Sequence, residues 1–304
     1  SRVTPTVRSN GVLLAQIVPE GGRVSGSSSI VELDAWNWED AGYKMDEGIH
    51  LNWPRTMAWT GWRTGNPQLK KNEKYSEEVA EVDRFFQEAQ AYSKKAIGLE
   101  KNLKFEAMRG LFDQSKTLYV HVNPSKAIAA AVLFAQQFGL RLVIVGGRDS
   151  WMQSQLLREN NVPVILGPTQ SLPRREDADI DQTFKTAALL QKDRVMFAFS
   201  DEGSWRQRNL AFQAGQAVGF GLDYEKAIQA LTLNAATILG IESNVGSLEV
   251  GKDATLIVSQ GDLLDMRTAK LEHAFIQGKA IDLDNKQKVL YRKYQKKYGQ
   301  SSGR

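Results

Sequence analysis

The sequence contains no cysteine, and this absence limits the kinds of site that the chain can form. Disulfides, thiolate metal ligands and thiol nucleophiles are all excluded. Histidine is scarce as well, since His50, His121 and His273 are the only three. A catalytic zinc ion usually takes three protein ligands, so a site made of imidazoles alone would need all three histidines to converge. A complete zinc site within this chain is therefore not expected.

Long apolar runs are also missing. No stretch approaches the roughly 18 uninterrupted apolar residues that a membrane helix requires, so we expect no membrane span. The hydrophobic content of 42% over 304 residues is nevertheless sufficient for one large domain with a small appendage.

Acidic residues are absent from the end of the chain. The stretch 286–304 has seven basic residues and no acidic one, whereas the formal charge of the whole chain is +4, so the rest is slightly acidic. We interpret this stretch as a solvated basic tail. Contact with a polyanion or a membrane surface is the alternative, although we expect no nucleic acid partner.

The chain begins with Ser1 rather than methionine, and an apolar strand-like run starts within a dozen residues. We therefore expect an N-terminal segment to be missing. An export signal would be lost with such a segment, so the location of the protein is unknown from the sequence. An exported or periplasmic location is compatible with the lack of cysteine.

Apolar strand-like runs alternate with amphipathic stretches through the centre of the chain. Residues 117–121 form one such run, Asn123 and Pro124 are typical of a helix start, and a second run follows at 140–145. Two further runs follow at 162–166 and 195–199. This alternation predicts a parallel sheet covered by helices, either a barrel or an open doubly wound sheet.

The two ends of the chain have a different pattern. Strand-like runs occupy 12–18, 30–33 and 48–52, and the spacing of apolar residues predicts a long amphipathic helix within 72–96. After Gly240, short β-type runs at 254–258, 273–277 and 288–291 predict a small antiparallel element.

One segment resembles a known family. Residues 231–258, LTLNAATILGIESNVGSLEVGKDATLIV, are similar to the exit segment of the amidohydrolase superfamily, although Thr255 stands where that family usually has Asp. Other stretches resemble its imidazolonepropionase-like branch. Residues 10–31 resemble the second and third barrel strands with a Gly/Ser loop between them, 121–130 (HVNPSKAIAA) the fifth strand, and 199–202 (FSDE) the eighth.

The resemblance implies an α/β fold, namely a (β/α)8 TIM-type barrel that is incomplete because it is entered at about the second strand. A small C-terminal β-sandwich portion would follow. The expected divisions are a barrel over 1–240, a sandwich portion over 241–291 and a basic tail over 292–304. The missing N-terminal segment or a partner chain would cover the open sheet edges, and a homo-oligomer is compatible with this arrangement.

Catalytic residues are expected where the parallel strands end, because their carboxyl ends converge on one face of a barrel. His121 and Asp201 occupy such positions. The resemblance implies that His121 is a metal ligand and that Asp201 both binds the metal and accepts a proton from the attacking water. The implied cofactor is a divalent metal, with zinc as the expected ion. Structural alternatives exist, because a strand-end His often bonds a carbonyl and Ser-Asp often caps a helix.

The sequence departs from the family pattern at two places. Gly146 and Gly147 stand where the sixth strand often has a His, and Asn52 stands where the fourth strand supplies a carboxylated Lys or a Glu. Asn52, Asn123, Gly146, Gly147 and Arg148 are candidate substrate-binding residues. We interpret His50 and His273 as structural.

Three functions are compatible with these observations. The first is a metal-dependent hydrolase of C–N bonds in an amide, a cyclic amide or a peptide-like small molecule, with its site incomplete in this chain. The second is an inactive amidohydrolase-like binding or scaffold protein. The third is an open-sheet ligand-binding domain, against which the match at 231–258 argues.

Overall fold

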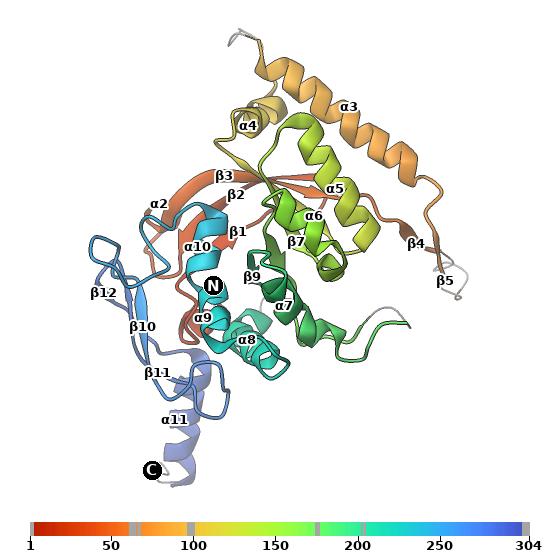
Figure 1. Cartoon of the computed structure of the whole chain (residues 1–304). Helices are drawn as coiled ribbons and strands as arrows, with labels where there is room; N and C mark the ends of the chain where they lie inside the picture. The colour runs from red at the N-terminus through yellow and green to blue at the C-terminus, as the bar shows by residue number, and fades with distance from the viewer. Residues whose placement is uncertain are drawn as a thin grey trace.

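A curved seven-stranded sheet forms the centre of the computed structural model, which describes residues 3–60, 65, 68–95, 101–173, 177–201, 203 and 205–299. Figure 1 shows the sheet with helices around it. In spatial order its strands are β1 (Leu14–Ile17), β2 (Val24–Glu32), β3 (Gly42–Asn52), β6 (Thr117–Val122), β7 (Leu142–Gly146), β8 (Val164–Leu166) and β9 (Phe197–Phe199).

Most of this sheet is parallel. Strands β3, β6, β7, β8 and β9 pair in parallel in that order, as the alternation of apolar runs and helices predicts. The curvature and strand order are those of a half-barrel, consistent with an incomplete TIM-type barrel. An open doubly wound sheet is therefore excluded for these strands.

The first three strands differ from the prediction. Strand β2 runs antiparallel to both β1 and β3, so residues 10–31 do not form two consecutive parallel barrel strands. The predicted Gly/Ser loop lies largely inside β2. Gly21 and Gly22 both have positive φ, which allows the chain to turn back after β1, and pairing on both sides holds the Gly/Ser stretch extended.

Helices cover the outer face of the parallel strands. Leu51 and Val120 lie in the same buried cluster as Phe86, Met108 and Ile128, which come from three different helices. The outer helices are α3 (Tyr75–Ser93), α4 (Leu103–Phe112), α5 (Ser125–Phe138), α6 (Ser154–Glu159), α7 (Gln182–Lys192), α8 (Leu210–Val218) and α9 (Tyr224–Leu231). The predicted helix within 72–96 is confirmed as α3.

The inner face has its own cluster. Tyr119, Val143 and Ala198 point away from the outer helices and pack against Ile238 of α10 (Leu233–Leu239). Asn234 of the same helix donates a hydrogen bond from Nδ2 to the carbonyl oxygen of Phe197, at 2.9 Å. The sequence motif at 231–240 thus fixes the strand that precedes Asp201.

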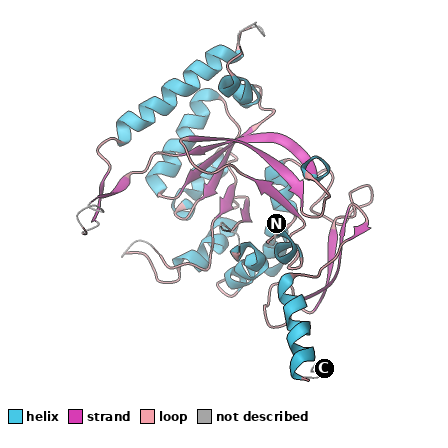
Figure 2. Cartoon of the chain, turned by 180° about the vertical axis from the view of Figure 1, so that it is seen from behind, coloured by secondary structure: helices cyan, strands magenta, loops and turns pink. Residues whose placement is uncertain are grey.

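A three-stranded antiparallel sheet follows α10. It consists of β10 (Leu256–Gln260), β11 (Lys270–Ile276) and β12 (Lys279–Ala280), which confirms the strands predicted near 254–258 and 273–277. Figure 2 shows it beside the curved sheet, together with α11 (Lys286–Tyr298). A sandwich needs two sheets packed together, and the described residues of the C-terminal part form one sheet.

The strand predicted at 288–291 is wrong, because these residues lie in α11. Asn285 caps this helix by accepting a hydrogen bond from the backbone N–H of Lys288 at 2.9 Å. The side chain of Asn285 also donates to Ser9, just after α1 (Thr4–Arg8), at 2.7 Å. The basic stretch therefore begins as an anchored helix.

Smaller elements complete the described chain. Strands β4 (Met57–Thr60) and β5 (Gln68–Lys71) form an antiparallel ribbon, α2 (Trp38–Ala41) lies between β2 and β3, and two short 3-10 helices are η2 (Ser150–Gln153) and η3 (Arg206–Asn209). No helix among the described residues is long and apolar enough to cross a membrane.

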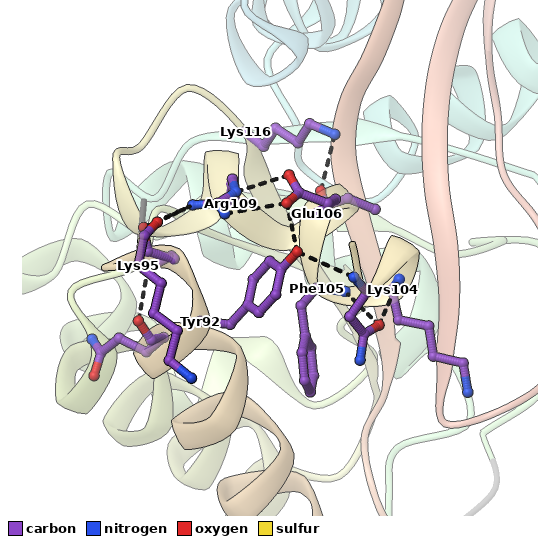
Figure 3. Close-up of polar contacts among 11 residues, drawn as sticks. Tyr92, Lys95, Lys104, Phe105, Glu106, Arg109 and Lys116 are labelled. Atoms are coloured by element: carbon purple, nitrogen blue, oxygen red, sulfur yellow. Dashed lines mark hydrogen bonds and ion pairs between the residues drawn. The ribbon is translucent and has the colours of Figure 1, made fainter. Parts of the chain in front are cut away.

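The corner between α3 and α4 is held by polar side chains, which Figure 3 shows. Tyr92 donates a hydrogen bond from its hydroxyl to Glu106 at 2.6 Å, and Arg109 donates from Nε to the same carboxylate at 2.8 Å. The guanidinium carbon of Arg109 lies 4.8 Å from the centre of the Tyr92 ring. These contacts link the end of one helix to the middle of the next.

Candidate active site

His121 and Asp201 lie at the same edge of the sheet. His121 is the second-last residue of β6, and Asp201 follows β9 by two residues. Because β6, β7, β8 and β9 are parallel, their carboxyl ends meet at one edge. The arrangement that the hypothesis of a shared site requires is therefore present.

His50 contacts His121 directly. Its Nδ1 lies 2.8 Å from Nε2 of His121, and its side chain is fully buried. His50 belongs to β3, two residues before Asn52, so both side chains point to the inner face. The strand period alone did not decide from the sequence which way His50 points, and whether its role is structural or catalytic stays a prediction.

Burial keeps His50 neutral. Desolvation, and next the neighbouring His121, lower the pKa of His50 from 6.5 to about 3. A neutral imidazole carries one N–H, so a single hydrogen bond joins the two rings. The Nε2 atom of His50 is buried and has no hydrogen-bond partner among the described residues. The pair therefore offers a buried polar atom at the inner face.

Tyr119 fixes the ring of His50 from the other side. The two rings are stacked, with centroids 4.7 Å apart and an interplanar angle of 7°. The Tyr119 hydroxyl donates to Oε2 of the buried Glu47 at 2.8 Å, and Gln16 donates to Oε1 at 2.6 Å. Burial and then the charge of Glu47 raise the pKa of Tyr119, so it remains a donor.

The ring of Tyr119 can occupy this place because residue 48 is glycine. A Cβ atom on Gly48 would lie 2.3 Å from Cε2 of Tyr119, which is far inside van der Waals contact. Neither Tyr119 nor Glu47 could be singled out from the sequence, because neither belongs to a recognisable motif. The pairing of β3 with β6 brings Tyr119 and Glu47 next to His50.

The carboxylate of Asp201 is held from two sides. Its side chain is only 3% exposed, and Gln213 of α8 donates a hydrogen bond from Nε2 to Oδ2. On the other side, Nε of Arg206 lies 3.4 Å from Oδ1, and the Arg206 side chain is 64% exposed. Sequence patterns indicated neither Gln213 nor Arg206.

The side chain of Asn52 donates hydrogen bonds to the turn that follows β1 and to the start of β2. Its Nδ2 donates to the carbonyl oxygen of Gly22 and to the hydroxyl of Ser25, both at 2.9 Å. These contacts tie the end of β3 to the hairpin between β1 and β2. A role of Asn52 in substrate binding stays a prediction.

Gly146 and Gly147 form a tight turn after β7. Both have positive φ, and a Cβ on Gly147 would lie 2.5 Å from Val164. The side chain of Asn123 accepts a hydrogen bond from the backbone N–H of Arg148 at 3.2 Å. Asn123 does not cap α5, whose N-cap is Pro124. Local geometry therefore accounts for both glycines, and a substrate contact at this turn stays a prediction.

The histidines and carboxylates do not make a complete metal site. Within the described part of the chain, no group of three or more His, Asp or Glu side chains is arranged to hold a metal ion. The two imidazoles in contact are fewer than the three protein ligands typical of catalytic zinc. A metal at this edge would need ligands from outside the described residues.

The model of the amidohydrolase family matches residues 58–283. The chain belongs to the amidohydrolase family. Members of this family are hydrolases and usually depend on a metal. This membership confirms the superfamily that residues 231–258 resemble. The imidazolonepropionase-like branch and the missing segment stay predictions.

Solved structures agree with the family. An amidohydrolase from Thermotoga maritima matches with a TM-score of 0.81 at 26% identity, over 92% of this chain and 74% of that chain. A zinc-bound adenosine deaminase from Xanthomonas campestris matches with a TM-score of 0.45 at 21% identity, over 72% of this chain and 62% of that chain.

A prolidase complexed with N-methylphosphonate-L-proline also matches, with a TM-score of 0.45 at 18% identity. The match covers 58% of this chain and 47% of the prolidase. At these TM-scores the deaminase and the prolidase add nothing to the assignment. No curated protein matches this sequence significantly.

Proposed function

We propose that this amidohydrolase-family chain provides the barrel part of a metal-dependent hydrolase that cleaves C–N bonds in small amides, cyclic amides or peptide-like molecules. The observation that supports the proposal is the presence of the His50–His121 pair and of Asp201 at one carboxyl edge of the parallel strands. In this proposal zinc is the expected metal, and its remaining ligands come from outside the described residues.

The proposed role of Asp201 is that of general base. A carboxylate can accept a proton from a water molecule as the water oxygen attacks the carbonyl carbon of the substrate. Gln213 donates a hydrogen bond to Oδ2 of Asp201, and Oδ1 of the same carboxylate lies towards the exposed side chain of Arg206. The protonated carboxyl would then return the proton to the departing nitrogen.

A second candidate function is a binding or scaffold protein that has lost catalysis. It is favoured by Asn52, which stands where the family pattern has a charged or bridging ligand and whose amide is occupied by Gly22 and Ser25. A neutral amide is a poor bridging ligand for a divalent cation. The two candidates differ in metal content.

Metal content distinguishes these two functions. The protein should be expressed from its complete gene in medium supplemented with zinc, manganese and iron, and its metal measured by mass spectrometry. The hydrolase proposal predicts about one equivalent or more, falling below about a tenth in His121→Ala. His273→Ala, on β11 in the C-terminal sheet, is the matched control and should keep its metal. Less than about a tenth of an equivalent in the wild type would contradict metal-dependent hydrolysis.

A further inference from the structure

Gln213 connects Asp201 to the segment that follows the neighbouring strand. It lies on α8 with 2% of its surface exposed, and its Nε2 donates to Oδ2 of Asp201. Its Oε1 accepts a hydrogen bond from the backbone N–H of Thr169 at 2.7 Å. Its backbone oxygen accepts a second hydrogen bond from the Thr169 hydroxyl at 3.0 Å. Thr169 follows β8 and is 3% exposed.

These contacts fix which way the amide of Gln213 points. The oxygen and nitrogen of a glutamine amide are interchangeable in shape, so only their partners decide the orientation. The backbone N–H of Thr169 can only donate, so it requires the amide oxygen of Gln213 on its side. The NH2 group must then face Asp201. A backbone group thus ensures that the carboxylate meets a donor.

We propose that Gln213 is a positioning residue for Asp201 and acts through the contact with Thr169, a role that rests on the function proposed above. By binding Oδ2 from the buried side, Gln213 orients the carboxylate so that Oδ1 lies towards Arg206, whose side chain is exposed. Because β8 and β9 end at the same edge, the connection holds two neighbouring parts of the candidate site in fixed relation.

Gln213→Glu tests the direction of the amide with little change in volume. One carboxylate oxygen can still accept from Thr169, but the other replaces the donor and repels Asp201. We expect kcat to fall by about 10²-fold with KM unchanged, since small misplacements of a catalytic group have effects of this size. Gln216→Glu, on the same helix but partly exposed, is the matched control and should keep the wild-type kcat. A wild-type kcat for Gln213→Glu would overturn the proposal.

A second measurement does not depend on activity. In the 15N–1H spectrum of the labelled wild-type protein, the side-chain amide pair of Gln213 is assigned through its contacts with the other protons of the same side chain, so the measurement does not need the Gln213→Glu variant. We expect this pair to shift in Asp201→Asn, because its acceptor loses a full charge. An unchanged pair would overturn the proposal, including when Gln213→Glu fails to fold. A shifted pair in a protein that hydrolyses no C–N substrate would contradict the hydrolase function but leave the contact in place.

Discussion

Single residues determine the inner face of the half-barrel. Tyr119 lies across the backbone of β3, stacks on His50 and reaches Glu47, and each of these contacts depends on the missing side chain at Gly48. The His50–His121 pair therefore stands on a buried, hydrogen-bonded support. In such a buried network each polar group left without a partner is energetically costly.

Gly48→Ala tests this support. The added methyl group would lie 2.3 Å from the Tyr119 ring and 2.9 Å from the Thr117 carbonyl oxygen, so the ring or the strand pairing must shift. We expect unfolding in urea to show a loss of about 1–3 kcal/mol in stability. Gly219→Ala, whose nearest neighbour is an oxygen of Gln216 at 3.4 Å, should change stability by less than about 0.5 kcal/mol. Equal effects of the two substitutions would contradict the proposed packing of Tyr119.

At the scale of helices and strands, the sequence pattern predicts an element correctly where burial alone determines it, and fails where contacts with other elements determine it. The amphipathic spacing of α3 and the alternation of strands and helices from β6 to β9 could be predicted, because periodic apolar residues directly reflect burial. The Gly/Ser strand β2 could not, because its extended form comes from pairing with β1 and β3. The helix α11 was missed because its start depends on the contacts of Asn285.

The corner between α3 and α4 allows a test of pH dependence. The hydrogen bond from Arg109, and next that from Tyr92, lower the pKa of Glu106 below its usual 4.5. Near that pH the unfolded chain binds more protons than the folded one, so the stabilisation is present above pH 4.5 and is lost as the pH falls through the lower folded value.

Glu106→Gln should therefore lower Tm at pH 7. Its difference from the wild type should shrink in scans at progressively lower pH below 4.5. Glu88→Gln, at an exposed position on α3, serves as the control and should leave Tm nearly unchanged. A difference between wild type and Glu106→Gln that is independent of pH would contradict the account of this corner.

At the scale of the whole molecule, the sequence indicated the half-barrel and the edge where His121 and Asp201 lie. Both follow from the parallel strand order, which periodicity and the motif at 231–258 make visible. The partners of these residues could not be foreseen in the same way. Gln213 approaches Asp201 from α8, and Thr169 approaches Gln213 from the segment after β8, so only the folded chain brings them together.

The most direct test of the account is amide hydrolysis by wild type and Asp201→Asn. Protein expressed from the complete gene should be assayed for amine release from a panel of N-acyl amino acids, cyclic amides and dipeptides. Asn keeps the volume of Asp but cannot accept the proton, so we expect kcat to fall by at least about 10²-fold with the Tm retained. Equal turnover by the two proteins would contradict a shared hydrolytic site at the edge where Asp201 and His121 lie.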